Sequence, residues 1–239
     1  MKKLIVLVFL TFAVAGSSYA QRKARGNGNV IERERRIQEF DKVEIDGDFE
    51  VVFLNNEFDK KIVTYGDSNL QGLISAQVED GVLSIGYRGP VEIIEQTVPL
   101  KVTIPTRSVV EISNIGSGKV HNMGTIEADN LVLTNSGEGT LELNIKAQTT
   151  DLNLTGNGDI VLTGRSNTAN IKSTGSGTID GKEISIFFSE ITIDGSGNVY
   201  TNTINGIDGY INGSGNIYYK VTKTVSVEEN GTGRALKFF

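Results

Sequence analysis

Residues 171–199 read IKSTGSGTIDGKEISIFFSEITIDGSGNV, and the architecture of the chain can be predicted from this segment. A Gly-Ser-Gly motif at 175–177 returns at 195–197, twenty residues later. Between the two motifs apolar and polar residues alternate, as in Glu190-Ile191-Thr192-Ile193. An alternation of this kind is typical of β-strands, because an amphipathic helix has a period of 3.6 residues. Each unit is therefore expected to be a strand, a glycine corner and a second strand.

The same unit recurs across the C-terminal half of the chain. Seven Gly-x-Gly motifs start 18 to 21 residues apart and contain half of the 28 glycines. Their glycines are Gly116, Gly118, Gly137, Gly139, Gly156, Gly158, Gly175, Gly177, Gly195, Gly197, Gly213, Gly215, Gly231 and Gly233. The residue four positions after each first glycine is apolar in all seven copies, and the residue four positions before it is aliphatic in six. The strands therefore repeat together with the corners.

A unit of this length cannot bury a hydrophobic face alone, so the copies must stack on one another. Stacking places equivalent residues about 4.8 Å apart, with aliphatic residues in inward ladders and the glycines along one corner. The glycines are expected to permit positive φ and a tight bend. We predict an all-β fold, a single-stranded parallel β-helix (solenoid) over 107–239, with Thr224–Phe239 as its last coil and closing edge. A propeller blade needs about forty residues, and the leucine-rich consensus is absent.

Residues 37–106 are rich in strand patterns but lack this period, and we interpret them as an N-terminal β-rich cap or the first β-helical part. The expected elements are an alternating segment Phe40–Leu54, a strand Lys61–Tyr65, a helical turn Asp67–Leu70, a hairpin through Asp80-Gly81 that joins 76–78 to 83–87, and a strand Val98–Ile104. The predicted domain thus spans 37–239.

The N-terminus has the pattern of an export signal. Lys2 and Lys3 precede an apolar run, Leu4–Ala15, and Ser18-Tyr19-Ala20 supplies the small residues of a cleavage site before Gln21. As a helix, twelve residues extend about 18 Å, too short to cross the hydrocarbon core of a membrane. We predict a signal peptide at 1–20 and a location in the periplasm or at the cell surface. No later segment is apolar enough to span a membrane, so the mature chain is expected to lack a transmembrane segment.

Residues 21–36 contain six arginines and lysines among Gly, Asn and Glu, and we interpret them as a basic linker. A contact with lipid headgroups or nucleic acid is the alternative for this cluster. The whole chain carries a net charge of −6, so no nucleic-acid partner is expected. The absence of Cys and the single His121 exclude a disulfide framework and a Cys- or His-based metal site. Only one of the seven corners is followed by Asp, which argues against a calcium-binding repeat.

Two motifs resemble a known family. The repeated Gly-Ser-Gly corners and the opening Phe40-x-x-Val43-x-Ile45-x-Gly47-x-Phe49-x-Val51 are similar to the "putative auto-transporter adhesin, head GIN domain" family, over residues 37–235. The resemblance implies a right-handed parallel β-helix that is exported by bacteria, mostly Bacteroidetes-like ones. It implies no established enzymatic activity, no cofactor and no site residues.

The function expected from these features is a non-catalytic, adhesin-like binding module of the cell envelope or surface, with carbohydrate or protein as its partner. The alternatives are a structural envelope protein without a discrete ligand and a polysaccharide-acting enzyme. For an enzyme the candidates would be Glu142 and Asp180, predicted two coils and about 10 Å apart, which is wide for a retaining pair. His121 is interpreted as a solvated strand residue. We therefore predict no catalytic, metal or cofactor-binding residue, and no cofactor.

Tyrosines near the C-terminus are the candidate binding patch. Tyr200, Tyr210, Tyr218 and Tyr219 lie within twenty residues, and Tyr200 and Tyr218 share the same offset from their glycines. Stacked coils would place these two rings on one face, about 4.8 Å apart. The pair could form a platform for a sugar or a protein, or an aromatic ladder that only stabilises the solenoid. The sequence leaves both alternatives open, as it does the oligomeric state.

Overall fold

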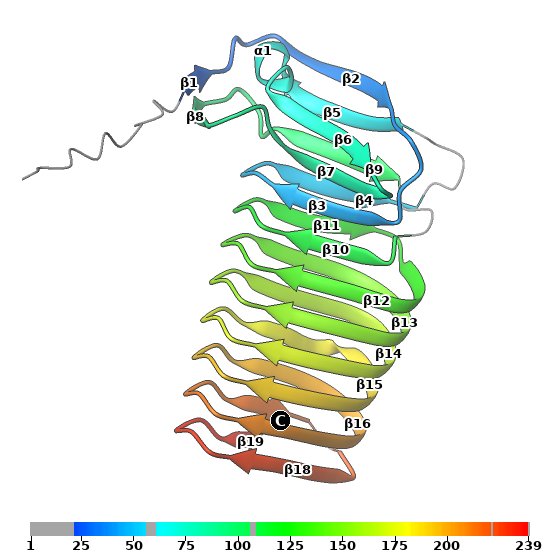
Figure 1. Cartoon of the computed structure of the whole chain (residues 1–239), viewed down its shortest axis with the longest axis vertical. Helices are drawn as coiled ribbons and strands as arrows, with labels where there is room; N and C mark the ends of the chain where they lie inside the picture. Colours follow the sequence, from blue (N-terminus) through cyan, green and yellow to red (C-terminus); the bar gives the residue numbers. More distant parts are fainter. Residues whose placement is uncertain (1–21, 56–60, 106–108, 221, 239) are drawn as a thin grey trace, which may run out of the picture.

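The computed structural model describes residues 22–55, 61–105, 109–220 and 222–238. They form a column of stacked β-coils of about seven turns, with further strands covering its N-terminal end (Figure 1). The prediction of an all-β parallel β-helix is confirmed. The predicted signal peptide at 1–20 and its cleavage before Gln21 lie outside the described residues, as does Phe239.

Each central coil is one long strand that follows a glycine corner. Neighbouring coils pair in parallel, so that Leu141 lies opposite Ile160, and Ile160 opposite Ile179. The column contains the strands β10 (Glu111–Asn114), β11 (Lys119–Met123), β12 (Ile126–Asn135), β13 (Thr140–Leu154), β14 (Asp159–Ser173), β15 (Ile179–Ile193), β16 (Val199–Ile211), β17 (Ile217–Tyr219), β18 (Thr224–Glu229) and β19 (Ala235–Lys237).

The aliphatic positions form the predicted inward ladders. The residues four positions after the corner glycines, from Val120 to Ile217, are buried, and Ala235 in the last coil is half-buried. A further inward column contains polar residues, and there Asn114 donates through Nδ2 to Oδ1 of Asn135 (3.2 Å). Nδ2 of Asn135 in turn donates to the carbonyl of Gly139 at 2.8 Å, so the oxygen and the nitrogen of the buried Asn135 amide both have a hydrogen-bond partner.

The glycine corners are required for a reason that differs from the predicted one. None of the fourteen corner glycines has a positive φ, so the prediction of positive φ is wrong, although the chain does bend at the corners. Instead, a Cβ at any of them would come closer than 3.0 Å to a backbone oxygen of the preceding coil. At most corners the N–H of the second glycine donates to the carbonyl oxygen of the first glycine in the preceding coil, as from Gly197 to Gly175 at 3.1 Å. Glycine is therefore required by the close stacking of backbones.

The first coil lies at the junction with the cap and consists of β3 (Lys42–Asp46) and β4 (Glu50–Leu54). These strands pair in parallel with β10 and β11 on one side, and with β7 (Val82–Tyr87) and β9 (Lys101–Pro105) on the other. At its corner Phe49 replaces the second glycine. The Phe49 ring is buried and meets Tyr87 edge-on, with ring centroids 5.4 Å apart. The repeat thus ends where an aromatic side chain begins to fill the cap.

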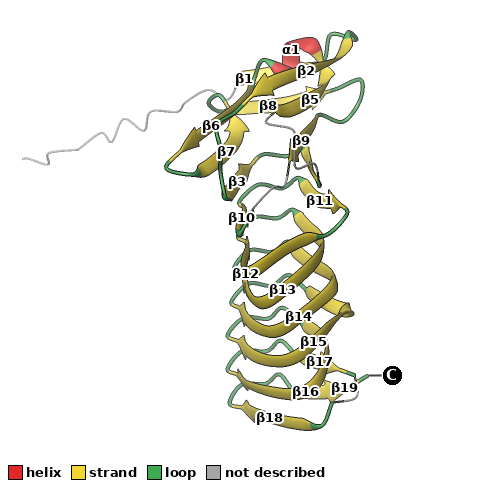
Figure 2. Ribbon diagram, turned by 90° about the vertical axis from the view of Figure 1, so that its right-hand side faces the viewer, coloured by secondary structure: helices red, strands yellow, loops and turns green. Residues whose placement is uncertain are grey.

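The cap turns the parallel stack into antiparallel pairs (Figure 2). Strand β2 (Val30–Arg36) pairs antiparallel with β5 (Lys61–Asp67), which also pairs antiparallel with β9. Strand β6 (Ile74–Glu79) and β7 form the predicted hairpin, with positive φ at Asp80 and Gly81. The predicted helical turn is α1 (Ser68–Gln71). The predicted strand Val98–Ile104 is shorter at its start, because β9 begins at Lys101.

The prediction of a linker at 21–36 is wrong for the described residues. They form β2 and a short strand β1 (Arg22–Arg25), which pairs in parallel with β8 (Val91–Glu95). Backbone hydrogen bonding to β5 and β8 holds these strands, while most of their side chains remain in solvent. Their charged composition therefore resembles that of a linker although their backbone is paired.

Asp67 ties the N-terminal segment to the cap. Its carboxylate is fully buried and accepts hydrogen bonds from the N–H of Gly28 (2.8 Å), the N–H of Thr97 (2.8 Å) and the Thr97 hydroxyl (2.9 Å). The hydrogen bond from the Thr97 N–H, together with the other donors, outweighs burial and holds the pKa of Asp67 below its usual range. Three chain segments thus meet at one carboxylate.

The C-terminal end has no such cover among the described residues. Strands β18 and β19 form the last coil, as predicted, and pair only with the coil before them. Glu229 lies in register with the buried Ile211, at an inward column position, and is exposed itself because no described coil follows. Its Oε1 accepts the N–H of Ala235 at 2.8 Å, and its Oε2 lies 3.4 Å from Nε of Arg234. A charged residue therefore stands at the open end of the column that contains Ile193 and Ile211.

Candidate functional site

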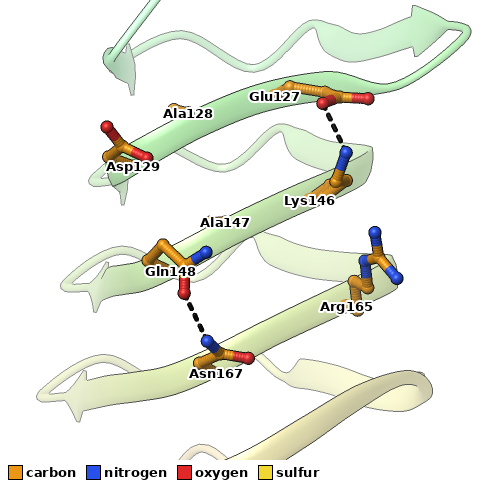
Figure 3. A pocket seen from close by; sticks show the side chains of 8 residues that line it. All are labelled: Glu127, Ala128, Asp129, Lys146, Ala147, Gln148, Arg165 and Asn167. Atoms are coloured by element: carbon orange, nitrogen blue, oxygen red, sulfur yellow. Dashed lines mark hydrogen bonds and ion pairs between the residues drawn. The ribbon is translucent and has the colours of Figure 1, made fainter.

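A shallow recess on the side of the solenoid crosses β12, β13 and β14 (Figure 3). Its volume is about 560 Å³, and its floor contains Ala128 and Ala147. Two columns of longer polar side chains flank this floor and run along the solenoid axis. One column consists of Glu127, Lys146 and Arg165, and the other of Asp129, Gln148 and Asn167.

The recess follows from the stacking register. The residues of each column are nineteen positions apart in the sequence, and β12, β13 and β14 pair without a register shift here. The flanking side chains point outward and the residues between them are turned toward the interior, because strand residues alternate in direction, so the recess lies between the two outward columns. This site was not predicted, because the glycine corners carry the strongest repeat signal and the recess lies away from them. The same nineteen-residue comparison at residues 127–129 would have found it.

Two pairs of side chains inside the recess are already bonded. Nζ of Lys146 lies 2.7 Å from Oε2 of Glu127, and Nδ2 of Asn167 donates to Oε1 of Gln148. These bonds join neighbouring coils and hold the side chains in place. They leave Nε2 of Gln148 as a donor and Oδ1 of Asn167 as an acceptor toward the recess.

Two charged side chains of the recess have no partner in the described part of the chain. The exposed guanidinium of Arg165 and the exposed carboxylate of Asp129 make no side-chain hydrogen bond or ion pair there. They lie on opposite columns and two coils apart, about 10 Å along the axis. The recess therefore presents one free cation, one free anion and two amides.

An exposed apolar patch continues the amide column into the next coil. Ser166 pairs with Ile186 and Thr168 with Phe188, so Asn167 lies opposite Phe187. The Phe187 side chain is 55% exposed, and Ile204 in the following coil is 48% exposed. An aromatic ring beside an amide is a combination that a sugar can use, because sugars present apolar faces and polar edges.

The tyrosine pair has the predicted geometry, but the ring faces of Tyr200 are covered. The centroids of Tyr200 and Tyr218 are 4.7 Å apart at an interplanar angle of 12°. Nζ of Lys182, from the preceding coil, lies 4.8 Å from the centroid of Tyr200, and Phe238 meets that ring edge-on at 6.0 Å. Both faces of Tyr200 are thus occupied, which favours the aromatic ladder over a sugar platform.

The other two predicted tyrosines lie apart from this stack. Tyr210 is exposed and pairs with Thr192 and Glu228, in a different column from Tyr200. Tyr219 is half-buried, lies in register with the buried Thr201, and packs against the core. The four residues therefore do not form one continuous patch.

The candidate residues for an enzyme are all engaged with other side chains. Glu142 and Asp180 lie two coils apart in one column, as predicted, and bind Lys119 (2.6 Å) and Lys182 (2.7 Å) respectively. The hydrogen bond from Lys119 holds the pKa of Glu142 below its usual range, whereas a general acid needs a raised pKa. His121 is not a freely solvated residue, because its side chain is 22% exposed and Nε2 lies 2.8 Å from Oε1 of Glu50.

No group of His, Cys, Asp and Glu among the described residues is arranged to hold a metal ion. In the same residues, no helix has the length and apolar character that a membrane crossing requires. The geometry leaves the side surface of the solenoid, and above all the recess, as the candidate contact region.

Comparison with known families supports the resemblance seen in the sequence. The family model described as "Putative auto-transporter adhesin, head GIN domain" matches residues 39–222. No curated protein matches the chain.

Solved structures show the same fold. The chain is similar to a "putative adhesin" from Bacteroides fragilis, at 24% identity and a TM-score of 0.84, covering 90% of this chain and 100% of that one. It is also similar to a "putative lipid binding protein" from Parabacteroides distasonis, at 21% identity and a TM-score of 0.74, over 91% and 100%. A "putative adhesin" from Parabacteroides merdae gives 20% identity and a TM-score of 0.72, over 91% and 100%.

Proposed function

Because the chain belongs to the head GIN domain family of "putative auto-transporter adhesins", we propose that it is an exported, non-catalytic binding module of the cell envelope or surface. Its partner is a carbohydrate chain, which it contacts along the side of the solenoid. The rigid column holds outward side chains at a fixed spacing, so little conformational entropy is lost when a repetitive partner binds.

The recess over β12–β14 is the observation that supports this proposal most directly. It brings free amide groups of Gln148 and Asn167, the carboxylate of Asp129 and the guanidinium of Arg165 to one surface, beside the exposed ring of Phe187. Amides offer both donors and acceptors, as sugar hydroxyls do, and carboxylates accept hydrogen bonds from hydroxyl groups. Neither a general acid nor an enclosed cavity is needed for such binding.

A glycan array tests the proposal. The secreted protein and two double variants would be compared: Gln148→Ala with Asn167→Ala in the recess, and Tyr200→Ala with Tyr218→Ala in the tyrosine stack. We expect the recess variant to lose the glycans that the wild type retains, while the tyrosine variant keeps them. Retention by the recess variant and loss by the tyrosine variant would instead assign binding to the predicted tyrosine patch.

The two other functions give different results in the same experiment. A structural envelope protein without a ligand would retain no glycan in any form. An enzyme would shorten the polysaccharide, which size-exclusion chromatography of the substrate detects. A variant with Glu142→Gln would then lose that cleavage, whereas the binding module leaves the polysaccharide intact.

A further inference from the structure

We propose that the recess recognises an acidic polysaccharide in which neutral sugars separate the acidic groups, and that Arg165 pairs with the carboxylate or sulfate. This inference rests on the proposed function and names its ligand class. The ligand chain would run along the solenoid axis, across the coils of β12, β13 and β14.

The cation in the recess that is free to bind is Arg165. The neighbouring Lys146 is neutralised by Glu127 at 2.7 Å, whereas the guanidinium of Arg165 is exposed and has no partner in the part of the chain that the structure describes. A guanidinium presents two parallel N–H groups that match the oxygens of a carboxylate or sulfate. The strongest new contact available at this surface is therefore with an acidic group.

The column of Asp129, Gln148 and Asn167 offers hydrogen bonds to hydroxyl groups of the ligand. Gln148 keeps a free donor and Asn167 a free acceptor, because each has used one group to bond with the other. The two amides are one coil, about 4.8 Å, apart along the axis, a spacing close to the advance of one pyranose in an extended glycan. A polysaccharide parallel to the axis can thus meet one amide with each sugar.

Asp129 determines how many acidic groups the ligand can carry. It lies about 10 Å from Arg165 along the axis, and its free carboxylate would repel a second acidic group placed there. The chain as a whole is acidic, with a net charge of −6, which disfavours a densely charged polyanion. A sparsely acidic chain places its acid at Arg165 and neutral hydroxyls at Asp129.

The test uses three polysaccharides of known chemistry. Gellan fragments carry uronates separated by neutral sugars, carboxyl-reduced gellan is the matched neutral form, and alginate carries a uronate on every sugar. Binding to the secreted protein would be measured by isothermal titration calorimetry. We expect gellan to bind about tenfold more tightly than its reduced form, with alginate weaker than gellan.

The variant Arg165→Gln should bind gellan and reduced gellan equally, whereas Arg33→Gln, at an exposed arginine of the cap, should behave as the wild type. Equal affinity of the wild type for both forms of gellan, tighter binding of alginate, or no binding of gellan would overturn the inference. The proposed function would still stand if neutral glycans were lost in the Gln148→Ala, Asn167→Ala variant. It would fail if the wild type retained no glycan at all.

Discussion

The two ends of the solenoid differ in how they protect the open edge of the stacked strands. At the N-terminal end, antiparallel strands cover the stack, and Phe49 and Asp67 are both buried there. At the C-terminal end, β18 has no strand on its outer side among the described residues, and Val225 is 39% exposed. An uncovered strand edge can pair with another chain, and inward-pointing charge is one way in which proteins prevent this.

The difference shows which contacts carry stability. A repeat protein gains stability from each coil and from each interface between coils, so the last coil, with one interface, is held less firmly than a central one. At the N-terminal end the cap adds contacts to those between the coils, through the buried ring of Phe49 and the buried carboxylate of Asp67. Changes of the same chemical kind should therefore cost more in the centre or at the cap than at the open end.

The largest effect is expected for a glycine corner in the centre. Gly195→Val would drive a side chain into the backbone of Gly175 and Thr174 in the preceding coil, and the neighbouring coils prevent any shift. We expect a loss of at least about 4 kcal/mol in the free energy of unfolding, a size that only disruption of a core or backbone reaches. Chemical denaturation of the purified protein measures it.

Two control variants accompany this measurement. Ser196→Ala, between the two glycines, should change stability by less than about 0.5 kcal/mol. Gly233→Val meets the backbone of Gly215 in the same manner, but no described coil follows, so the last coil can detach and the cost to the remaining molecule is smaller. Equal losses for Gly195→Val and Gly233→Val would contradict the difference between centre and end.

The next effect concerns the aromatic residues at the two ends. Phe49→Ala removes a buried ring beneath the cap, and truncation of a buried Phe costs about 3–5 kcal/mol. Tyr200→Ala with Tyr218→Ala removes a half-buried stack near the open end and should cost no more than about 1–2 kcal/mol. Thermal unfolding followed by circular dichroism separates the two. A larger loss for the tyrosine variant would reverse the order of the ends.

How far the sequence predicts the fold also differs along the molecule. The central coils were predictable because the same backbone contact recurs in every copy. Gly175 and Gly195, for example, are both required because a Cβ would clash with the preceding coil. The φ argument for these glycines was wrong, because sequence shows that a Cβ is excluded but not which atom excludes it. In the cap each contact occurs once, and β2 gives only the signal of Val30 and Ile31 before a run of charges.

The same reasoning applies to the candidate site. The 4.7 Å separation of Tyr200 and Tyr218 follows from their shared offset and was predicted. The cover that Lys182 and Phe238 provide was not predicted, because these two residues do not share the offset of the tyrosines and the directions of their side chains cannot be read from the repeat. The recess itself needs three columns to be compared at once, including the alanines that make its floor.

A smaller effect, with a characteristic pH dependence, is expected at Asp67. Its pKa is lowered by hydrogen bonds in the folded state, so its contribution to stability is full above its ordinary pKa of 3.8 and is lost as the pH falls through the lower folded value. Asp67→Asn removes the charge from these hydrogen bonds and should cost about 2 kcal/mol at neutral pH. Below pH 3.8 the difference from the wild type should shrink.

Denaturation midpoints between pH 2 and pH 7 measure this change. Asp208→Asn is the matched control toward the open end, because the Asp208 side chain is exposed and should cost less than about 0.5 kcal/mol at every pH. A constant difference between Asp67→Asn and the wild type over the whole range would show that the carboxylate does not contribute through its charge.

The smallest change in stability is expected at Glu229, where the readout is assembly. Glu229 occupies the column position of Ile193 and Ile211, and its carboxylate bonds to Ala235 and Arg234 across the last coil. Glu229→Ile should alter the free energy of unfolding by about 1 kcal/mol or less, because a lost charge-assisted bond is offset by added apolar contact. It also removes the charge that a second copy would have to bury when the β18 edges of two chains pair. Light scattering at increasing concentration should therefore show a larger mass for Glu229→Ile than for the wild type.

The control is Glu228→Ile, at the neighbouring outward position. It adds the same side chain but leaves the charge of Glu229 in the inward column, and it should keep the wild-type mass. If both variants associate equally, added surface hydrophobicity is the cause, and the open end is protected by something other than the inward charge of Glu229.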